Sequence, residues 1–257
     1  MVFFRPGFAL AALVTLAAGT NALACGAANT GAPAASPEGA APAATPEGAA
    51  PDASALTPTI DNPYAGFGSV RSAVYAGKER DEDTGKLVPV RMTYTVRDEP
   101  ATVGGIQATV VEVSDFEDGE LAEKTRDYYA QDAAGIVYYV GEHVDDYEGG
   151  KVTGHGGQWI AGEKDARPGI FMPAAPKVGD AFEQERAPGV AEDQTKVIAK
   201  VASIKVPAGT FEDCIEVEDF DPISKAKQRK VYCRGVGLVR EVLSRGGTIE
   251  LIEVHTR

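Results

Sequence analysis

Histidine offers the broadest chemistry of any side chain in this sequence, and the chain has three of them. His143 and His155 flank a glycine-rich segment, and Asp145 and Asp146 lie between them. Imidazoles and carboxylates that converge in this way could bind a metal ion such as zinc. Histidines among loop carboxylates are more often solvated surface groups. We therefore predict no metal site here, and we expect His255, near the C-terminus, to be exposed.

Acidic stretches form the second group of candidate ligands. Residues 81–85 read Asp-Glu-Asp-Thr-Gly, but the fifth position is Gly where a calcium loop needs an oxygen ligand, and no Glu follows at the required offset. In the acidic run 212–221, the carboxylates alternate with Ile215 and Val217, so we interpret the run as mainly the solvated face of a strand. The sequence thus predicts neither a metal nor a cofactor.

Catalytic motifs of known spacing are absent from the sequence. It contains no Gly-x-Ser-x-Gly elbow, no His-Glu-x-x-His, no phosphate loop and no dinucleotide-binding fingerprint. We predict no catalytic residue, and we expect a protein that is not an enzyme. A hydrolase of unfamiliar design is the less favoured alternative.

Two of the three cysteines, Cys214 and Cys233, are placed to form a disulfide. If the intervening segment folds as a hairpin with Ile223 and Ser224 at its tip, the two cysteines face each other across antiparallel strands. Directly opposed residues have Cα separations of about 4.5 or 5.5 Å, which a disulfide can bridge. An oxidising compartment would favour this bond. The alternative is a pair of unrelated buried thiols.

Alternation with a period of two residues is the main structural signal from residue 70 onward. It predicts strands at residues 88–96, 106–116, 121–131, 136–140, 197–206, 211–220, 231–243 and 248–254. Turn signals such as Asp118-Gly119, Gly149-Gly150 and Gly246-Gly247 separate them. We predict a mainly β fold with few helices, in which a single antiparallel meander forms an open or half barrel. A two-layer β-sandwich is the alternative.

Proline interrupts this rhythm between residues 168 and 188. We expect this segment to be a loop whose apolar residues pack on the sheet, because proline removes hydrogen-bond donors from a ladder. An exposed binding edge is the alternative. Trp159 and the tyrosine pairs at 128–129 and 138–139 could line a groove for a carbohydrate or a lipid, but we interpret them mainly as core packing.

Several blocks resemble a family of exported bacterial β-rich proteins and lipoproteins, over most of residues 61–254. The blocks are Asp-Tyr-Tyr-Ala-Gln-Asp at 127–132, Gly-Ile-Val-Tyr-Tyr-Val-Gly-Glu at 135–142, Pro-Gly-Ile-Phe-Met-Pro at 168–173, Val-Pro-Ala-Gly-Thr-Phe at 206–211 followed by Cys214, and Gly-Val-Gly-Leu-Val-Arg-Glu at 235–241. The resemblance implies an exported or lipid-anchored β-protein, distantly similar to lipoprotein-carrier half-barrels. It transfers no catalytic residue, and Cys233 departs from its pattern.

The first residues predict export. Residues 8–18 form an apolar run of the length found in signal peptides, too short to span a bilayer. The sequence Ala22-Leu23-Ala24-Cys25 suits lipoprotein processing, in which the Cys25 thiol carries the lipid, and it also suits ordinary signal peptidase. We therefore predict a signal peptide at 1–24 and a lipid anchor at Cys25.

A low-complexity segment follows the cysteine. Residues 25–57 are rich in Ala, Pro and Gly and nearly lack large apolar side chains, so we predict a disordered tether. Residues 58–257 then form one β-rich globular domain. We expect localisation in the cell envelope, either periplasmic or at the cell surface, through the N-terminal lipid. A fully secreted protein is the alternative.

Net charge limits the class of partner. The formal net charge of −13 at pH 7 argues against nucleic acid, because phosphate binding requires a basic surface. We expect a non-catalytic binding or structural role. The alternative is a carrier or sensor that holds an apolar ligand in an open β-barrel. The partner itself, protein or apolar ligand, is not identified by the sequence.

Overall fold

The computed structural model describes residues 51–81 and 84–257, so the predicted signal peptide, Cys25 and most of the predicted tether lie outside the described residues. One short 3-10 helix, η1 (Ala53–Ala55), precedes the strands. The strands are β1 (Val70–Arg80), β2 (Leu87–Val96), β3 (Ala101–Val103), β4 (Ile106–Glu117), β5 (Glu120–Gln131), β6 (Val137–Glu148), β7 (Lys151–Gly154), β8 (Trp159–Ile160), β9 (Gly169–Met172), β10 (Ala181–Glu183), β11 (Gln194–Val206), β12 (Gly209–Phe220), β13 (Lys227–Cys233), β14 (Gly237–Val242) and β15 (Gly247–Thr256).

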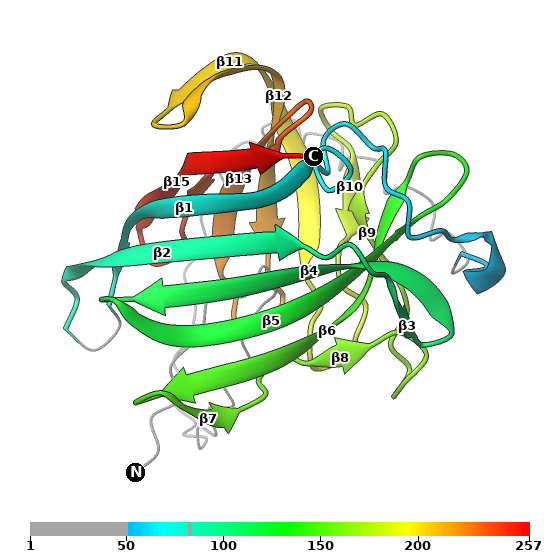
Figure 1. Ribbon diagram of the computed structural model, residues 1–257, viewed down its shortest axis with the longest axis horizontal. Helices are drawn as coiled ribbons and strands as arrows, with labels where there is room; N and C mark the ends of the chain where they lie inside the picture. The colour runs from blue at the N-terminus through cyan, green and yellow to red at the C-terminus, as the bar shows by residue number, and fades with distance from the viewer. Residues whose placement is uncertain (1–50, 82–83) are drawn as a thin grey trace, which may run out of the picture.

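All fifteen strands belong to one antiparallel sheet, which confirms the predicted fold class. The main path runs β10-β11-β12-β13-β14-β15-β1-β2-β4-β5-β6-β7, with β3 paired to β4 and with β8 and β9 paired to β6. The first and last strands, β1 and β15, pair with each other and join two meanders (Figure 1). The path does not close, because it begins at β10 and ends at β7.

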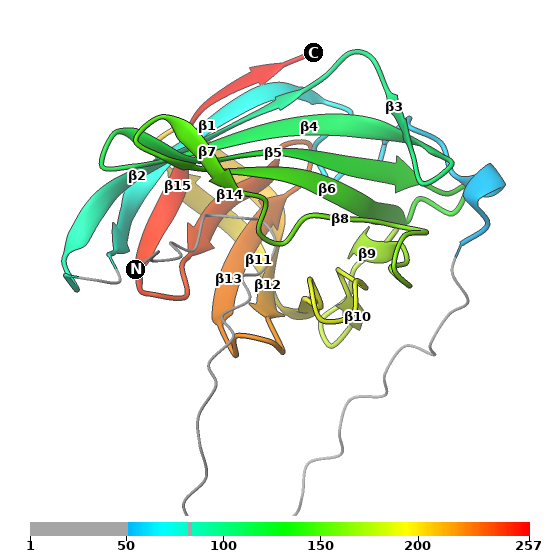
Figure 2. The same cartoon turned by 90° about the horizontal axis from the view of Figure 1, so that it is seen from below.

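The sheet is strongly curled. Strands β2, β4, β5 and β6 form a broad curved layer, and β11, β12 and β13 cross that layer at a steep angle on its inner side (Figures 1 and 2). At the seam between β9 and β10, an isolated bridge joins Arg167, just before β9, to Arg186, just after β10. The inner face of the curl is therefore enclosed by both meanders.

Tight turns set the register of the hairpins. The β4–β5 turn holds Asp118 and Gly119 at φ 49° and 86°, the left-handed conformations that a two-residue hairpin turn requires. Gly149 and Gly150 have φ 55° and 74° and form the β6–β7 turn. The Asp-Gly and Gly-Gly signals in the sequence therefore fall at strand reversals, as predicted.

Some predicted elements have different limits in the structure. The strand predicted at 136–140 continues to Glu148, and the one predicted at 231–243 is divided into β13 and β14 by a turn. The segment after Pro168 was expected to be a loop, but β9 forms a short ladder with β6. The ladder is possible because Gly169, Ile170 and Met172 retain their N–H groups and the register shifts once along β9.

The domain includes residues before its predicted start at 58. Leu56 is buried, and Thr57 exchanges two backbone hydrogen bonds of 2.9 Å with Gln131 at the end of β5. Asn62 donates from its amide to the carbonyls of Gly135 and Pro173, at 2.9 Å each. The chain preceding β1 is thus fastened across the ends of β5 and β9.

Aromatic rings fill one part of the inner face. Tyr129 stacks on Tyr139 with ring centroids 4.7 Å apart, and Phe171 lies 4.8 Å from Tyr129 and 6.0 Å from Tyr232. Trp159 meets Tyr139 edge-on at 5.4 Å. These contacts connect β5, β6, β8, β9 and β13, so the two meanders share one core.

No helix in the described residues is long and apolar enough to cross a membrane.

Candidate functional site

Eight carboxyl side chains are each more than nine-tenths buried; six lie on strands of the curled sheet and two on the segment between β10 and β11. They are Asp115, Glu123, Asp127, Glu142, Glu185, Asp193, Asp219 and Glu241, and we call them the inner carboxyl cluster. Two other buried carboxyls have local partners. Glu79 pairs with Arg245, and Asp221 accepts backbone N–H groups in the β12–β13 turn.

Strand alternation explains why these carboxyls face inward. On β5, Glu123, Thr125, Asp127 and Tyr129 occupy every second position, and all four are buried. Side chains two residues apart on a strand share a face of the sheet. The carboxyls of this strand are therefore in phase with the core residue Tyr129, and folding the core buries them as well.

Like carboxyls lie directly opposite each other on neighbouring strands in two rows. Asp115 on β4 faces Glu123 on β5, which also faces the half-buried Asp146 on β6, and Asp127 on β5 faces Glu142 on β6. Like charges directly opposite each other destabilise a sheet, more strongly where the pair is dry. Such an arrangement requires either bound protons or a positively charged partner.

Burial and mutual repulsion hold these carboxyls partly protonated. Burial, together with the charges of Asp146 and Asp127, raises the pKa of Glu123 to about 8. Burial raises the pKa of Asp127 to about 7, even though the hydroxyl of Thr125 donates to its carboxylate at 2.6 Å. Burial and the nearby Glu185 carboxyl raise the pKa of Glu142 well above its ordinary value.

A single ammonium group partly compensates this charge. Among the described residues, Lys230 is the one lysine or arginine that is fully buried, and its Nζ lies 2.8 Å from Asp219 Oδ2 and 3.9 Å from Glu241 Oε1. Burial by itself would lower the pKa of Lys230, but Asp219 and Glu241 outweigh it and hold the pKa well above its usual range. In the part of the chain that the structure describes, the inner carboxyl cluster therefore has one fully buried cation, which contacts two of its eight members.

Several polar atoms of the cluster have no hydrogen-bond partner in the described part of the chain. They are Asp115 Oδ2, Glu123 Oε1, Glu142 Oε1 and Asp193 Oδ1. The Tyr139 hydroxyl is buried near Asp127 and Glu142, and the Trp159 indole N–H is buried near Glu185. An unpaired buried polar atom costs about 1–3 kcal/mol, so the unpaired oxygens lower the stability of the fold.

The histidines do not form the metal site that their spacing allowed. His143 Nδ1 lies 2.8 Å from the Tyr128 hydroxyl, whereas His155 Nδ1 lies 3.1 Å from Asp145 Oδ1. Within residues 51–81 and 84–257, no three His, Cys, Asp or Glu side chains converge in a way that could hold a metal ion. His255 is exposed, as predicted, and contacts Glu253.

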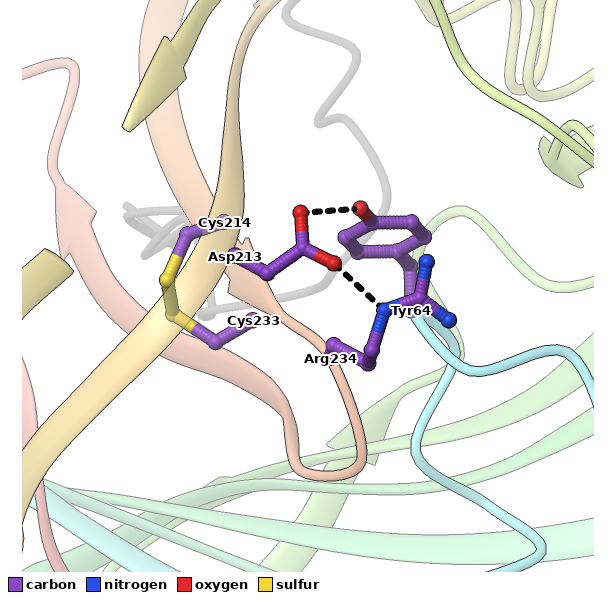
Figure 3. The surroundings of a disulfide bond; sticks show 5 residues. All are labelled: Tyr64, Asp213, Cys214, Cys233 and Arg234. Atoms are coloured by element: carbon purple, nitrogen blue, oxygen red, sulfur yellow. Dashed lines mark hydrogen bonds and ion pairs between the residues drawn. A yellow bond between two sulfur atoms is a disulfide. The ribbon is translucent and has the colours of Figure 1, made fainter. Parts of the chain in front are cut away.

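The cysteines of the β12–β13 hairpin have the predicted register. Cys214 faces Cys233, and the structure contains a disulfide between them with a Cα–Cα distance of 4.0 Å. On the neighbouring positions, the Tyr64 hydroxyl donates to Asp213 Oδ1 at 3.0 Å and Arg234 pairs with Asp213 Oδ2 (Figure 3). This contact ties the segment before β1 to the disulfide-bonded hairpin. Cys25 lies outside the described residues.

The aromatic residues singled out in the sequence serve mainly as packing. Tyr129 and Tyr139 are fully buried and stacked, and Trp159 packs against Tyr139. Tyr128, on the other face of β5, is also buried, because it packs edge-on against His143 at 5.4 Å between ring centroids. Tyr138 is half-buried.

Sequence reasoning missed the inner carboxyl cluster, although a signal for it exists. In the run 212–221, Glu216 and Glu218 are partly exposed as expected, but Asp219 is buried because it is in phase with Ile215 and Val217. Asp115 continues the phase of Val111 and Val113 in the same way. A carboxylate that is in phase with the apolar positions of its own strand is expected to be buried, and this pattern could have predicted the cluster.

Comparisons with known proteins do not identify a family for this chain. No protein-family model matches the chain, and no curated protein matches it. A crystal structure from Parabacteroides distasonis, described as that of a "putative lipoprotein", has a TM-score of 0.37 and 16% sequence identity, and covers 77% of this chain and 100% of that chain. A similarity of this size carries no argument about function.

Proposed function

We propose that this protein is an exported protein of the cell envelope, held at a membrane by a lipid on Cys25, that binds a positively charged ligand inside its curled sheet. The observation that carries the proposal is the excess of inner carboxyls over internal cations. A cationic ligand would supply the missing charge and the missing hydrogen-bond donors together. No turnover of the ligand is proposed.

An apolar ligand fits this interior less well. Tyr129, Tyr139 and Phe171 are aromatic, but the buried carboxyls of Glu142 and Glu185 lie near the two tyrosines. Covering these carboxyls with a hydrocarbon would add no hydrogen-bond donor for them, at the full desolvation cost. A carrier of purely apolar molecules is therefore the weaker proposal.

Hydrolysis is the second function that the same residues allow. Two facing carboxyls with raised pKa values, such as Asp127 and Glu142, are the groups used for general acid and base catalysis near neutral pH. The test for it is product formation from a bound ligand, followed in the wild type and in Glu142→Gln.

Ligand charge is tested by thermal unfolding and calorimetry of the exported protein with magnesium chloride, 1,8-diaminooctane and palmitate as probes. We expect a cationic probe to raise the melting temperature and Glu142→Gln/Glu185→Gln to abolish that rise. The control variant is Glu117→Gln/Glu120→Gln, which removes two carboxylates at the solvent-accessible β4–β5 turn. Binding of palmitate alone, or equal cation effects in both variants, would contradict the proposal.

The anchor is tested separately at Cys25. Mass spectrometry of the mature protein should find an acylated Cys25 at the N-terminus, and the protein should partition into detergent. Cys25→Ser should abolish both properties while the disulfide between Cys214 and Cys233 is kept. A mature chain that begins elsewhere and carries no lipid would refute the anchor and leave the ligand proposal intact.

A further inference from the structure

One lysine and two carboxyls from three neighbouring strands meet in the interior. Lys230 on β13 directly faces Glu241 on β14, and Asp219 on β12 lies two positions along from the residue opposite Lys230. Lys230 Nζ is 2.8 Å from Asp219 Oδ2 and 3.9 Å from Glu241 Oε1, and the three side chains are 0%, 2% and 8% exposed. An amine and a carboxyl group are therefore held in contact where solvent does not compete for either.

Two neighbouring side chains fix the orientation of these groups. The Thr195 hydroxyl donates to the other oxygen of Asp219, Oδ1, at 2.7 Å. With its amide oriented so that both ends are satisfied, Gln228 accepts from Lys230 Nζ and donates to Glu241 Oε1, each at 3.2 Å. The two oxygens of Asp219 thus have different partners, a hydroxyl on Oδ1 and the lysine on Oδ2, and Glu241 is held near the same lysine.

An amine and a carboxylic acid in contact can condense to an amide. The ion pair becomes such a reactive pair when one proton moves from Lys230 Nζ to Asp219 Oδ2 along the 2.8 Å contact, without exchange with solvent. Burial favours the neutral form of both groups, because desolvation penalises charge. The charged pair is the predominant form, and the neutral amine that this transfer produces is the nucleophile.

We propose that Lys230 and Asp219 form an intramolecular isopeptide bond, with Glu241 as the general base and then the general acid. Nζ attacks the carboxyl carbon of Asp219, the N–C bond forms, and negative charge develops on Oδ1 beside the Thr195 hydroxyl. The Glu241 carboxylate takes a proton from Nζ and gives it to the hydroxyl at Oδ2. The C–Oδ2 bond then breaks and one water leaves, so Glu241 returns to its initial state and no co-reactant is required.

Proximity and burial distinguish this pair from an ordinary ion pair. Well-oriented intramolecular reactions reach effective concentrations of roughly 10⁵–10⁸ M. Amide formation also removes two buried charges, whose desolvation opposes the ion pair. On the same hairpin, Lys227 Nζ lies 3.0 Å from Glu218 Oε1, but the Lys227 side chain is 60% exposed. Solvent stabilises that ammonium in its charged form, so we expect the pair of Lys227 and Glu218 not to react.

The bond would change little else in the domain. It removes one carboxyl and one ammonium together, so the charge excess behind the proposed cation binding is unchanged, and the inference does not depend on that proposal. The bond also lies inside the loop that Cys214 and Cys233 already close, so it adds little to the loop entropy. Its signature is therefore chemical, not a large change in stability.

Peptide mapping by mass spectrometry tests the bond directly. Trypsin has cleavage sites between Asp219 and Lys230, after residues 225, 227 and 229. In the reduced and alkylated protein, the peptide with Asp219 separates from the peptide with Lys230 unless an amide joins them. We expect one joined species that is lighter than the sum of its two parts by one water, with no cleavage after Lys230.

A variant at Glu241 tests the mechanism. Glu241→Gln keeps the contact between Lys230 and Asp219 but removes the proton acceptor, so we expect two separate peptides and cleavage after Lys230. The control Glu218→Gln, which alters the exposed pair, should retain the joined species. Thermal unfolding verifies that both variants are folded.

The wild-type digest by itself decides whether the bond exists. Two separate peptides from the folded wild-type protein would overturn the inference, whatever the variants show. A joined species of equal yield in Glu241→Gln would overturn the role of Glu241. Joining of the peptide with Lys227 in place of that with Lys230 would show that burial does not select the reacting amine.

Discussion

Asp127 and Glu142 face each other across β5 and β6 with both side chains about 1% exposed. Thr125 donates to Asp127, whereas Glu142 Oε1 has no partner in the described residues. The two carboxyls therefore differ in environment although they share one site. Both ionise with difficulty, which makes protons or cations part of the folded state.

Stability without ligand should decrease as pH rises from about 5 to about 8.5. The pKa values of Glu123, at about 8, and of Asp127 and Glu241, at about 7, are raised above those of an unfolded chain. The folded state then binds more protons than the unfolded state, so stability is complete at low pH and is lost as pH passes the folded pKa values. We expect a loss of several kcal/mol, or roughly 10 °C in melting temperature.

Glu142→Gln provides the control for this pH dependence. The variant should be more stable than the wild type at about pH 8 and nearly equal to it at about pH 5, where Glu142 is protonated. Chemical denaturation at both pH values measures the difference. A wild-type protein that is most stable at about pH 8 would contradict the interpretation of the inner carboxyls.

Lys230 should be essential for stability near neutral pH. Lys230→Met leaves Asp219 and Glu241 buried without their cation, which costs about 4 kcal/mol in comparable buried ion pairs. The triple variant Lys230→Met/Asp219→Asn/Glu241→Gln should recover most of that loss, as measured by urea unfolding. If Lys230→Met alone is as stable as the wild type, the network has been misassigned.

Gly169 should be required at the seam between β9 and β10. A Cβ atom at this position would lie 2.0 Å from the backbone oxygen of Gln184. We expect Gly169→Ala to cost about 3 kcal/mol, because backbone must move to relieve the overlap. Gly189→Ala is the comparison: its site is open, and its φ of 71° makes it cost about 1 kcal/mol. Equal losses in the two variants would show that the seam is not tightly packed.

Reduction of the disulfide should lower stability without unfolding the domain. The bond between Cys214 and Cys233 closes a sequence separation of 19 residues, for which loop entropy gives about 3 kcal/mol. Cys214→Ala/Cys233→Ala should reproduce the decrease in melting temperature caused by dithiothreitol. The reductant should have no further effect on that double variant, and a further decrease would indicate a different target.

The hairpin of β12 and β13 shows which structural features short-range sequence patterns can predict and which they cannot. Its register could be predicted because the turn near Asp221 and the facing cysteines constrain the same two strands. The burial of Asp219 on the same hairpin could not be predicted from its charge. An acidic residue is ordinarily solvated, and only its phase with Ile215 and Val217 indicated otherwise.

The sequence by itself determined most of the strands, several of their turns and the facing cysteines, because alternation and turn residues are properties of neighbouring residues. The tertiary structure alone decided that Glu142, Glu185 and Asp219 share one interior, because β6, the segment after β10 and β12 meet only when the sheet curls. Curling encloses whatever lies on the inner face. Among the described residues, carboxyls that each strand could have solvated separately are thereby buried together with Lys230.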